Sequence, residues 1–191
     1  MISSKLPNTR VLEYRGKVFS IGGDDKELTI PNFMKSVSDS SSLVGAPKAI
    51  SLPLAQGKGM DRAVSGAIAQ DLPGQATSLV NLLLLPRYLI HRSQWKLVTV
   101  LIGANNVCGD CLPDDRANTT AVVNSVREAL LTLRNSAPRW KINLLGVPSV
   151  TQVYDAALPV PYCAKVFERF HFCPCIHEEK WRKGTCLYYL C

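Results

Sequence analysis

The sequence comprises 191 residues, of which 47% are hydrophobic, and carries a formal net charge of +7. This length suits one domain with a substantial core and is short for two complete domains. Because the 22 lysine and arginine residues are scattered, we interpret the charge as ordinary solvated surface. An anionic lipid surface is the alternative partner, and no nucleic acid is expected. The leucine run Leu82–Leu85 stops at Pro86 and is too short to span a membrane.

In chain order, four apolar runs are predicted to be strands, because each is short and bounded by glycine or proline. They cover residues 17–21, 62–65, 96–102 and 141–147. Continuous apolar runs of this kind are typical of strands that are buried on both faces of a parallel sheet.

Three helices are predicted between these strands. The first covers residues 30–37 with Pro31 in its first turn, and the second covers residues 71–85 with Asp71 as its N-cap. The third, residues 115–134, has one apolar stripe: Val122, Val123, Val126, Ala129, Leu130 and Leu133. Strands that alternate with helices predict an α/β fold with a parallel sheet. Residues 36–59 are predicted to be a loop, and the chain after Val147 shows no clear period.

Two strand ends carry residues suited to acyl-transfer chemistry, namely Ser65-Gly66-Ala67 and Gly103-Ala104-Asn105-Asn106. In parallel sheets, functional groups collect beyond the carboxyl ends of strands. A glycine N–H and an asparagine side-chain amide are donors that suit an oxyanion. Gly66 and Asn105 are therefore candidate oxyanion-hole residues. The alternative is that both simply close turns after strands.

Several segments, taken in order, resemble the GDSL (SGNH) ester hydrolases in the form found in phospholipase B. Residues 95–111, a strand followed by Gly-Ala-Asn-Asn-Val-Cys-x-x-Cys, are similar to the family's third block. Residues 63–76 are similar to its second block, and residues 14–24 to the segment that follows its first block. Cys163 and Cys173-Pro-Cys175 are similar to its downstream cysteine cluster.

The resemblance implies a three-layer α/β/α flavodoxin-like fold with a parallel sheet, here incomplete. It implies one partial domain over residues 1–191, best matched over 11–147, with a cysteine-rich tail over 148–191. The implied activity is hydrolysis of carboxylic esters in phospholipids or lysophospholipids, without cofactor or metal. Gly66 and Asn105 match the family's oxyanion-hole positions.

The sequence departs from the family pattern at its catalytic blocks. It contains no Gly-Asp-Ser triplet, and Ser38-Asp39-Ser40 lacks the glycine. No aspartate lies three residues before His91, His171 or His177, and Asn106 stands where the family has aspartate. We therefore expect a fragment that does not turn over, because serine without a general base is a poor nucleophile. Two alternatives remain: a catalytically dead relative that binds lipid or protein, or a basic secreted module.

Seven cysteines suggest disulfides in an oxidising compartment, although the odd number leaves one thiol free or paired outside the chain. The disulfide candidates are Cys108, Cys111, Cys163, Cys173 and Cys175. A zinc site in residues 171–177 is the alternative, but spacing of ligands at every second residue does not suit structural zinc. Asn118-Thr-Thr is a glycosylation sequon, so we expect secretion or the extracellular face of the plasma membrane. No signal peptide is recognisable, and a missing N-terminus is expected.

Overall fold

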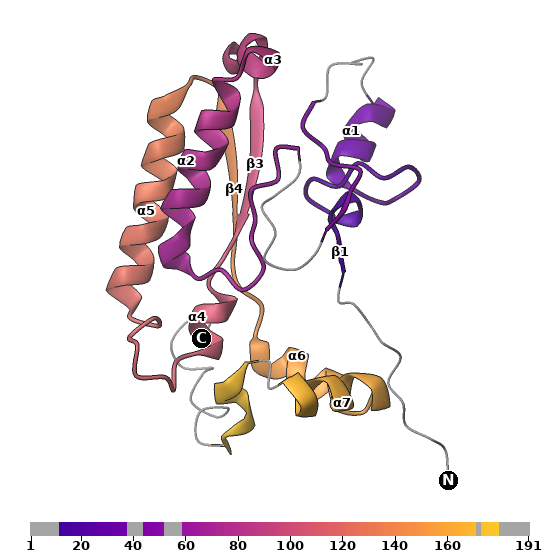
Figure 1. The fold of residues 1–191 in the computed structure, drawn as a ribbon, viewed down its shortest axis with the longest axis vertical. Coiled ribbons are helices and arrows are strands. Elements are labelled where there is room, and N and C mark those ends of the chain that lie inside the picture. Colours follow the sequence, from indigo (N-terminus) through magenta and orange to yellow (C-terminus); the bar gives the residue numbers. More distant parts are fainter. Residues whose placement is uncertain (1–11, 38–43, 52–58, 171–172, 180–191) are drawn as a thin grey trace. The chain divides into compact units, whose positions relative to one another are not determined.

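The computed structural model describes residues 12–37, 44–51, 59–170 and 173–179 (Figure 1). These residues form a mixed α/β structure, as the sequence predicts. They divide into two compact units, of which the first ends at Gly66 and the second begins at Ala67. The expectation of one partial domain stays a prediction, and each unit is described by itself below.

The first unit contains little regular structure. Strands β1 (Glu13–Tyr14) and β2 (Ile50–Ser51) pair antiparallel. Helix α1 (Ile30–Val37) has the predicted bounds. Its entry is held by Thr29, whose hydroxyl oxygen accepts from the Asn32 N–H at 3.3 Å and whose hydroxyl donates to the Gly22 carbonyl at 2.7 Å.

The predicted strands over residues 17–21 and 62–65 are wrong. A 3-10 turn, Arg15–Lys17, is followed by a second turn in which the Gly22 N–H donates to the Val18 carbonyl at 2.7 Å. Near residue 63, a side chain rather than a neighbouring strand satisfies the backbone: the Asp61 carboxylate accepts a hydrogen bond from the Ala63 N–H. Both runs are apolar, but their backbone groups are satisfied by turns and side chains, so no strand pairing is needed.

The second unit is built around two parallel strands, β3 (Lys96–Leu101) and β4 (Trp140–Leu145), both predicted by the sequence. Lys96 pairs with Trp140 at one end and Leu101 with Leu145 at the other. The helices of this unit are α2 (Leu72–Leu83), α3 (Pro86–Leu89), α4 (Ala104–Cys108), α5 (Thr119–Ser136), α6 (Val150–Ala157) and α7 (Pro161–Phe170). Helices α4 and α5 form the crossover between the two strands, as parallel pairing requires.

Helices α2 and α5 lie side by side (Figure 1) and supply half of the buried apolar side chains of this unit. Their buried side chains are Leu72, Ala76, Leu79, Leu83, Ala129 and Leu133. Full burial of a leucine contributes roughly 1.5–3 kcal/mol. Both helices were predicted, and their caps differ in detail. Asp71 precedes α2 but its carboxylate accepts from the Ile68 N–H at 2.9 Å, whereas the Asn118 side chain caps α5 by accepting from the Ala121 N–H at 3.0 Å.

The two faces of the β3–β4 sheet differ in their burial. Val100 is buried on one face, whereas Leu97 and Leu101 on the other are 45% and 50% exposed. Within this unit the described residues therefore form two layers, helix and sheet. The three-layer flavodoxin-like arrangement stays a prediction.

After Val147 the chain is more regular than the sequence suggests, because it forms α6 and α7. Ser149 caps α6, accepting from the Gln152 N–H at 3.4 Å. Tyr154 of α6 packs edge-on against Phe167 of α7, with ring centroids 5.2 Å apart. These aromatic contacts, which are not apparent in a linear pattern, hold the two short helices together.

Candidate active site

The end of β3 is shaped by Gly103. This residue has φ +114°, a left-handed conformation that glycine adopts without steric cost, and it is the N-cap of α4. Its carbonyl accepts from the Val107 N–H at 3.1 Å. The turn places Asn105 and Asn106 directly beyond the carboxyl end of a parallel strand.

Asn105 is half-buried, and its side-chain amide donates to the Ala67 carbonyl at 2.9 Å. One N–H of the amide is therefore used to orient the group, and the amide carries a second N–H. An amide held in this way is a preorganised donor, which is what stabilisation of an oxyanion requires.

Asn106, in contrast, is fully enclosed, with 1% of its surface exposed. Its side-chain oxygen accepts from the Ala69 N–H at 2.8 Å. Its amide donates to the Gln70 side-chain oxygen at 2.8 Å and to the Arg116 carbonyl at 2.6 Å. Both amide hydrogens are thus used, and a carboxylate here would face the Arg116 carbonyl with no hydrogen to donate. Asn106 therefore ties α4 to the start of α2 and to the loop before α5.

Gly66, the other oxyanion candidate, closes the first unit. It is exposed and has φ +83°. Gly66 and Asn105 fall in different units, so their pairing in one oxyanion hole stays a prediction.

The segment that leads to Gly66 is held by Arg15, a buried residue that the sequence reasoning did not single out. Its guanidinium donates to Asp61 at 2.8 Å, to the Ala63 carbonyl at 2.9 Å and to Glu13 at 2.7 Å. It also donates to the Ser51 hydroxyl at 2.9 Å. The only sequence signal was its place in Tyr14-Arg15-Gly16, part of a segment that resembles the family.

Glu13 connects this arginine to Ser65, because its carboxylate also accepts from the Ser65 hydroxyl. Burial raises the pKa of Glu13, but the Ser65 hydrogen bond and the Arg15 charge outweigh burial and lower that pKa below its ordinary value. The Ser65 hydroxyl therefore donates to a carboxylate that is stable as an anion.

Two disulfides lie beside α4. Cys108 pairs with Cys173, and Cys111 pairs with Cys175. The Cys-x-x-Cys motif is thereby joined to the Cys-Pro-Cys motif, whose first cysteine directly precedes the 3-10 turn Pro174–His177 and whose second cysteine lies in that turn. Of the five disulfide candidates, Cys163 is a free thiol within the described residues. The two other cysteines of the chain, Cys186 and Cys191, lie outside the described residues. Because their sulfurs are in disulfides, Cys173 and Cys175 are not thiolate ligands for zinc.

The other predicted residues take separate places. His91 contacts the Gln94 side chain at 2.8 Å, and the His177 ring packs edge-on against Tyr154. His171 and Ser38-Asp39-Ser40 lie outside the described residues. Asn118 is exposed, its side-chain oxygen makes the α5 cap, and its side-chain nitrogen donates to the Asp115 carboxylate at 3.2 Å, so its glycosylation stays a prediction.

Three known proteins are similar to this chain. Mouse "Phospholipase B1, membrane-associated" is 29% identical over 169 residues, which is 86% of this chain and 11% of that protein. The rat and human proteins of the same name are 28% and 27% identical over 166 residues, again 86% of this chain and 11% of each protein. The chain is a relative of phospholipase B. It spans about a tenth of the length of these relatives.

Two further comparisons find no match. No model of a protein family matches the chain, and no solved structure is similar to it. Within the described ranges, no helix is long and apolar enough to cross a membrane.

Proposed function

We propose that this chain forms part of a phospholipase B-like GDSL ester hydrolase, in which the Asn105 amide and the Gly66 N–H stabilise the oxyanion of an ester carbonyl. The observation that carries the proposal is the position of Asn105, which lies just beyond the carboxyl end of β3 with its amide oriented by Ala67. The similarity to phospholipase B1 proteins supports phospholipid or lysophospholipid esters as substrates. The chemistry needs no cofactor or metal.

In this proposal the 191 residues do not complete a catalytic cycle by themselves. They contain neither Gly-Asp-Ser nor Asp-x-x-His. Donors alone stabilise a developing charge but supply neither the attacking oxygen nor the proton transfer. We expect the purified chain to show no hydrolysis of p-nitrophenyl butyrate above the buffer rate. Turnover that a serine-directed fluorophosphonate abolishes would contradict this.

The oxyanion role has a separate test that needs no turnover. Butylphosphonate, a tetrahedral anion, is titrated into the isotope-labelled chain and the amide resonances are followed by NMR. We expect the Gly66 backbone and Asn105 side-chain signals to shift together, with one saturation curve, and the Asn105→Ala variant to lose the Gly66 shift. The Asn106 side-chain signals are the internal control, because both of its N–H groups are already used. If Gly66 and Asn105 respond with different curves, or not at all, the two donors do not form one site.

We further propose that the complete protein works at the extracellular face of a membrane, with α1 at the lipid surface. The supporting observation is the exposure of apolar side chains in α1 and just before it: Phe33 and Val37, four residues apart on the helix, are each 68% exposed, and Leu28 is 98% exposed. Lys26 and Lys35 lie beside these residues in the sequence, which suits anionic lipid. Sedimentation with phosphatidylserine vesicles tests this: Phe33→Ser is expected to weaken binding, and an unchanged bound fraction would contradict it.

A further inference from the structure

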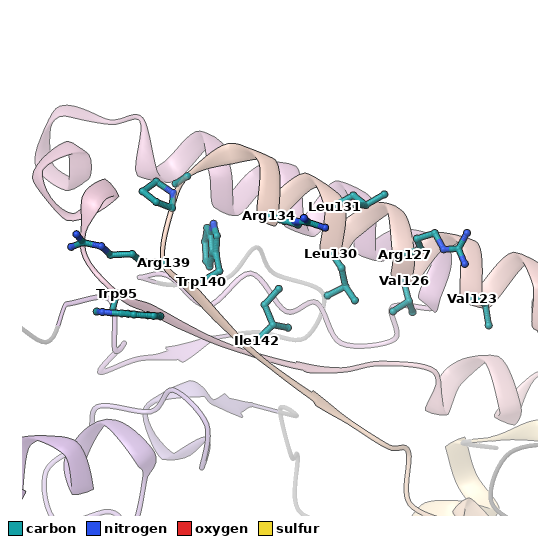
Figure 2. A pocket seen from close by; sticks show the side chains of 12 residues that line it. Trp95, Val123, Val126, Arg127, Leu130, Leu131, Arg134, Arg139, Trp140 and Ile142 are labelled. Atoms are coloured by element: carbon teal, nitrogen blue, oxygen red, sulfur yellow. The ribbon is translucent and has the colours of Figure 1, made fainter.

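The second unit contains a groove at the amino ends of β3 and β4, below α5 (Figure 2). Its volume is about 770 Å³, within the range of pockets that hold small organic ligands. Asn105 follows the carboxyl end of β3, so the groove lies at the opposite end of the strands from the candidate oxyanion site. It is lined by Trp95, Val123, Val126, Arg127, Leu130, Leu131, Arg134, Ala137, Pro138, Arg139, Trp140 and Ile142.

The apolar lining of the groove comes from one face of strand β4 and one face of helix α5. Trp140 and Ile142 alternate along β4 and therefore project on the same face of the sheet. Val126 and Leu130 lie four residues apart on α5 and share one helical face. Figure 2 shows side chains of both elements directed into the space between the helix and the strands. Much of this surface is open, since Val123 is 51% and Trp95 is 74% exposed.

Positive charge surrounds the groove. Arg127, Arg134 and Arg139 line it, and none of the twelve lining residues, all within the described ranges, is acidic. No ion pair or hydrogen bond is made by these three guanidinium groups to any described residue. In the protein interior and its surface pockets, cations without partners attract anions strongly.

The positive charge around the groove also affects the pKa of a nearby lysine, Lys96. Burial, and then the charges of Arg139 and Arg92, lower the pKa of Lys96, which begins β3. Its ammonium group lies 5.2 Å from the centre of the Trp140 ring. The indole N–H of Trp140 is buried and has no hydrogen-bond partner in the described part of the chain. The accessible polar groups of the groove are therefore its positive charges.

We propose that this groove binds a single-chain anionic amphiphile, namely a long-chain fatty-acid carboxylate. The hydrocarbon chain lies along Val126, Leu130 and Ile142, and the carboxylate lies at the end of the groove that is lined by the cationic residues Arg134 and Arg139. A second copy of the chain suits the groove less well, because two chains that each carry a net charge of +7 repel each other. The proposal does not depend on the hydrolase function, since the groove lies away from Asn105 and includes none of the proposed oxyanion donors.

Fluorescence quenching provides the test, because two of the chain's three tryptophans line the groove. The full-length, disulfide-bonded chain carries Trp181→Phe, so that emission reports on Trp95 and Trp140. Dibromostearate is added below its critical micelle concentration. We expect saturable quenching, and displacement of the quencher by oleate.

The decisive variant is Arg134→Gln/Arg139→Gln. We expect about tenfold weaker binding of oleate, equivalent to about 1.4 kcal/mol, and little change for uncharged oleyl alcohol. The matched control is Lys141→Gln/Lys165→Gln. Lys141 follows Trp140 but projects on the other face of the sheet, and Lys165 is exposed on α7. The control is expected to bind oleate as the parent does.

Three outcomes would overturn the proposal. The first is the absence of saturable quenching by a chain whose circular dichroism shows it to be folded. The second is an equal loss of oleate binding in the arginine and lysine double variants, which would indicate attraction to net charge rather than to this groove. The third is a dimer that resists dibromostearate and dissociates when Leu130→Asp is introduced, which would make a second copy the occupant.

Discussion

The two units of this chain are stabilised by different interactions. In the unit that begins at Ala67, helices α2 and α5 bury a set of aliphatic side chains, and two disulfides hold α4 to the residues around Cys173. In the unit that ends at Gly66, β1 and β2 have two residues each, and a buried arginine forms hydrogen bonds to four residues in three segments of the chain. Hydrophobic burial is distributed over many residues, whereas a charged network depends on each of its members.

This difference predicts how each unit responds to substitution. Loss of one aliphatic contact leaves the α2–α5 packing largely in place. Loss of Arg15 leaves two carboxylates close together without a cation, so the whole first unit depends on one residue.

Arg15→Met is expected to destabilise the first unit by about 3–5 kcal/mol, the cost of removing one partner from a buried ion pair. The arginine and Asp61 side chains are 5% and 9% exposed, so water does not replace the lost contacts. Hydrogen exchange measured by mass spectrometry, with peptides assigned to each unit, provides the readout. Lys17→Met is the matched control: its pair with Glu27 is exposed and screened by water, so little or no change in stability is expected. Equal effects of the two substitutions would contradict the central role of Arg15.

Replacement of the Cys108–Cys173 disulfide by two serines is expected to destabilise the second unit by about 2–5 kcal/mol. The bond closes a loop with a sequence separation of 65 residues, so it restricts the unfolded chain strongly. Urea unfolding followed by circular dichroism measures the change. Cys163→Ser, which removes a thiol that is free within the described residues, is the control and is expected to change stability little. A midpoint that moves equally in both variants would show that the disulfide is not what stabilises this unit.

Asn106→Asp is expected to destabilise the second unit by about 1–3 kcal/mol at neutral pH, because a buried carboxylate would face the Arg116 carbonyl. The loss is expected to shrink as the pH falls, since a protonated carboxyl group regains a hydrogen to donate. Thermal unfolding over a pH series measures both effects. Asn124→Asp on the exposed surface of α5 is the control, with an expected change of about 0.5 kcal/mol or less. A variant as stable as the parent would show that the Asn106 network is not needed.

Lowering the pH is expected to destabilise the first unit because the Glu13 carboxylate becomes protonated. The expected loss of stability is smaller than that caused by the substitutions above. The pKa of Glu13 is lowered in the folded chain, so the folded state is favoured above the carboxyl group's ordinary pKa. This contribution is lost as the pH falls through the lowered pKa. Hydrogen exchange of peptides from residues 12–37, corrected for the intrinsic pH dependence of exchange, measures it. Glu13→Gln is expected to remove part of this pH dependence, and an unchanged profile would exclude Glu13 as its source.

The regular elements with strong patterns were predictable. The bounds of α1 and the positions of β3, β4, α2 and α5 follow from apolar periodicity, although α5 begins at Thr119 rather than at residue 115, because the Asn118 side chain caps it there. The predicted strands near residues 19 and 63 were wrong because periodicity does not report which groups satisfy the backbone. In both places a turn or a side chain does so.

The candidate site was predictable only in part. Asn105 was found because an amide after a strand end suits an oxyanion, but its orientation by the Ala67 carbonyl depends on a contact between residues 38 positions apart. Arg15 was missed because a lone arginine in a sequence is usually exposed, and its burial requires partners at positions 13, 51 and 61.

Local patterns and short motifs in the amino-acid sequence therefore determined β3, β4, α2 and α5 of the second unit, the oxyanion candidates and the similarity to phospholipase B, but not α3, α4, α6 and α7. Tertiary structure alone decided the enclosure of Asn106, the Arg15 network, which cysteines pair, and the cationic groove below α5. The physical reason is that hydrogen bonds, disulfides and uncompensated charge depend on distances between segments far apart in the chain, and a linear pattern does not contain those distances.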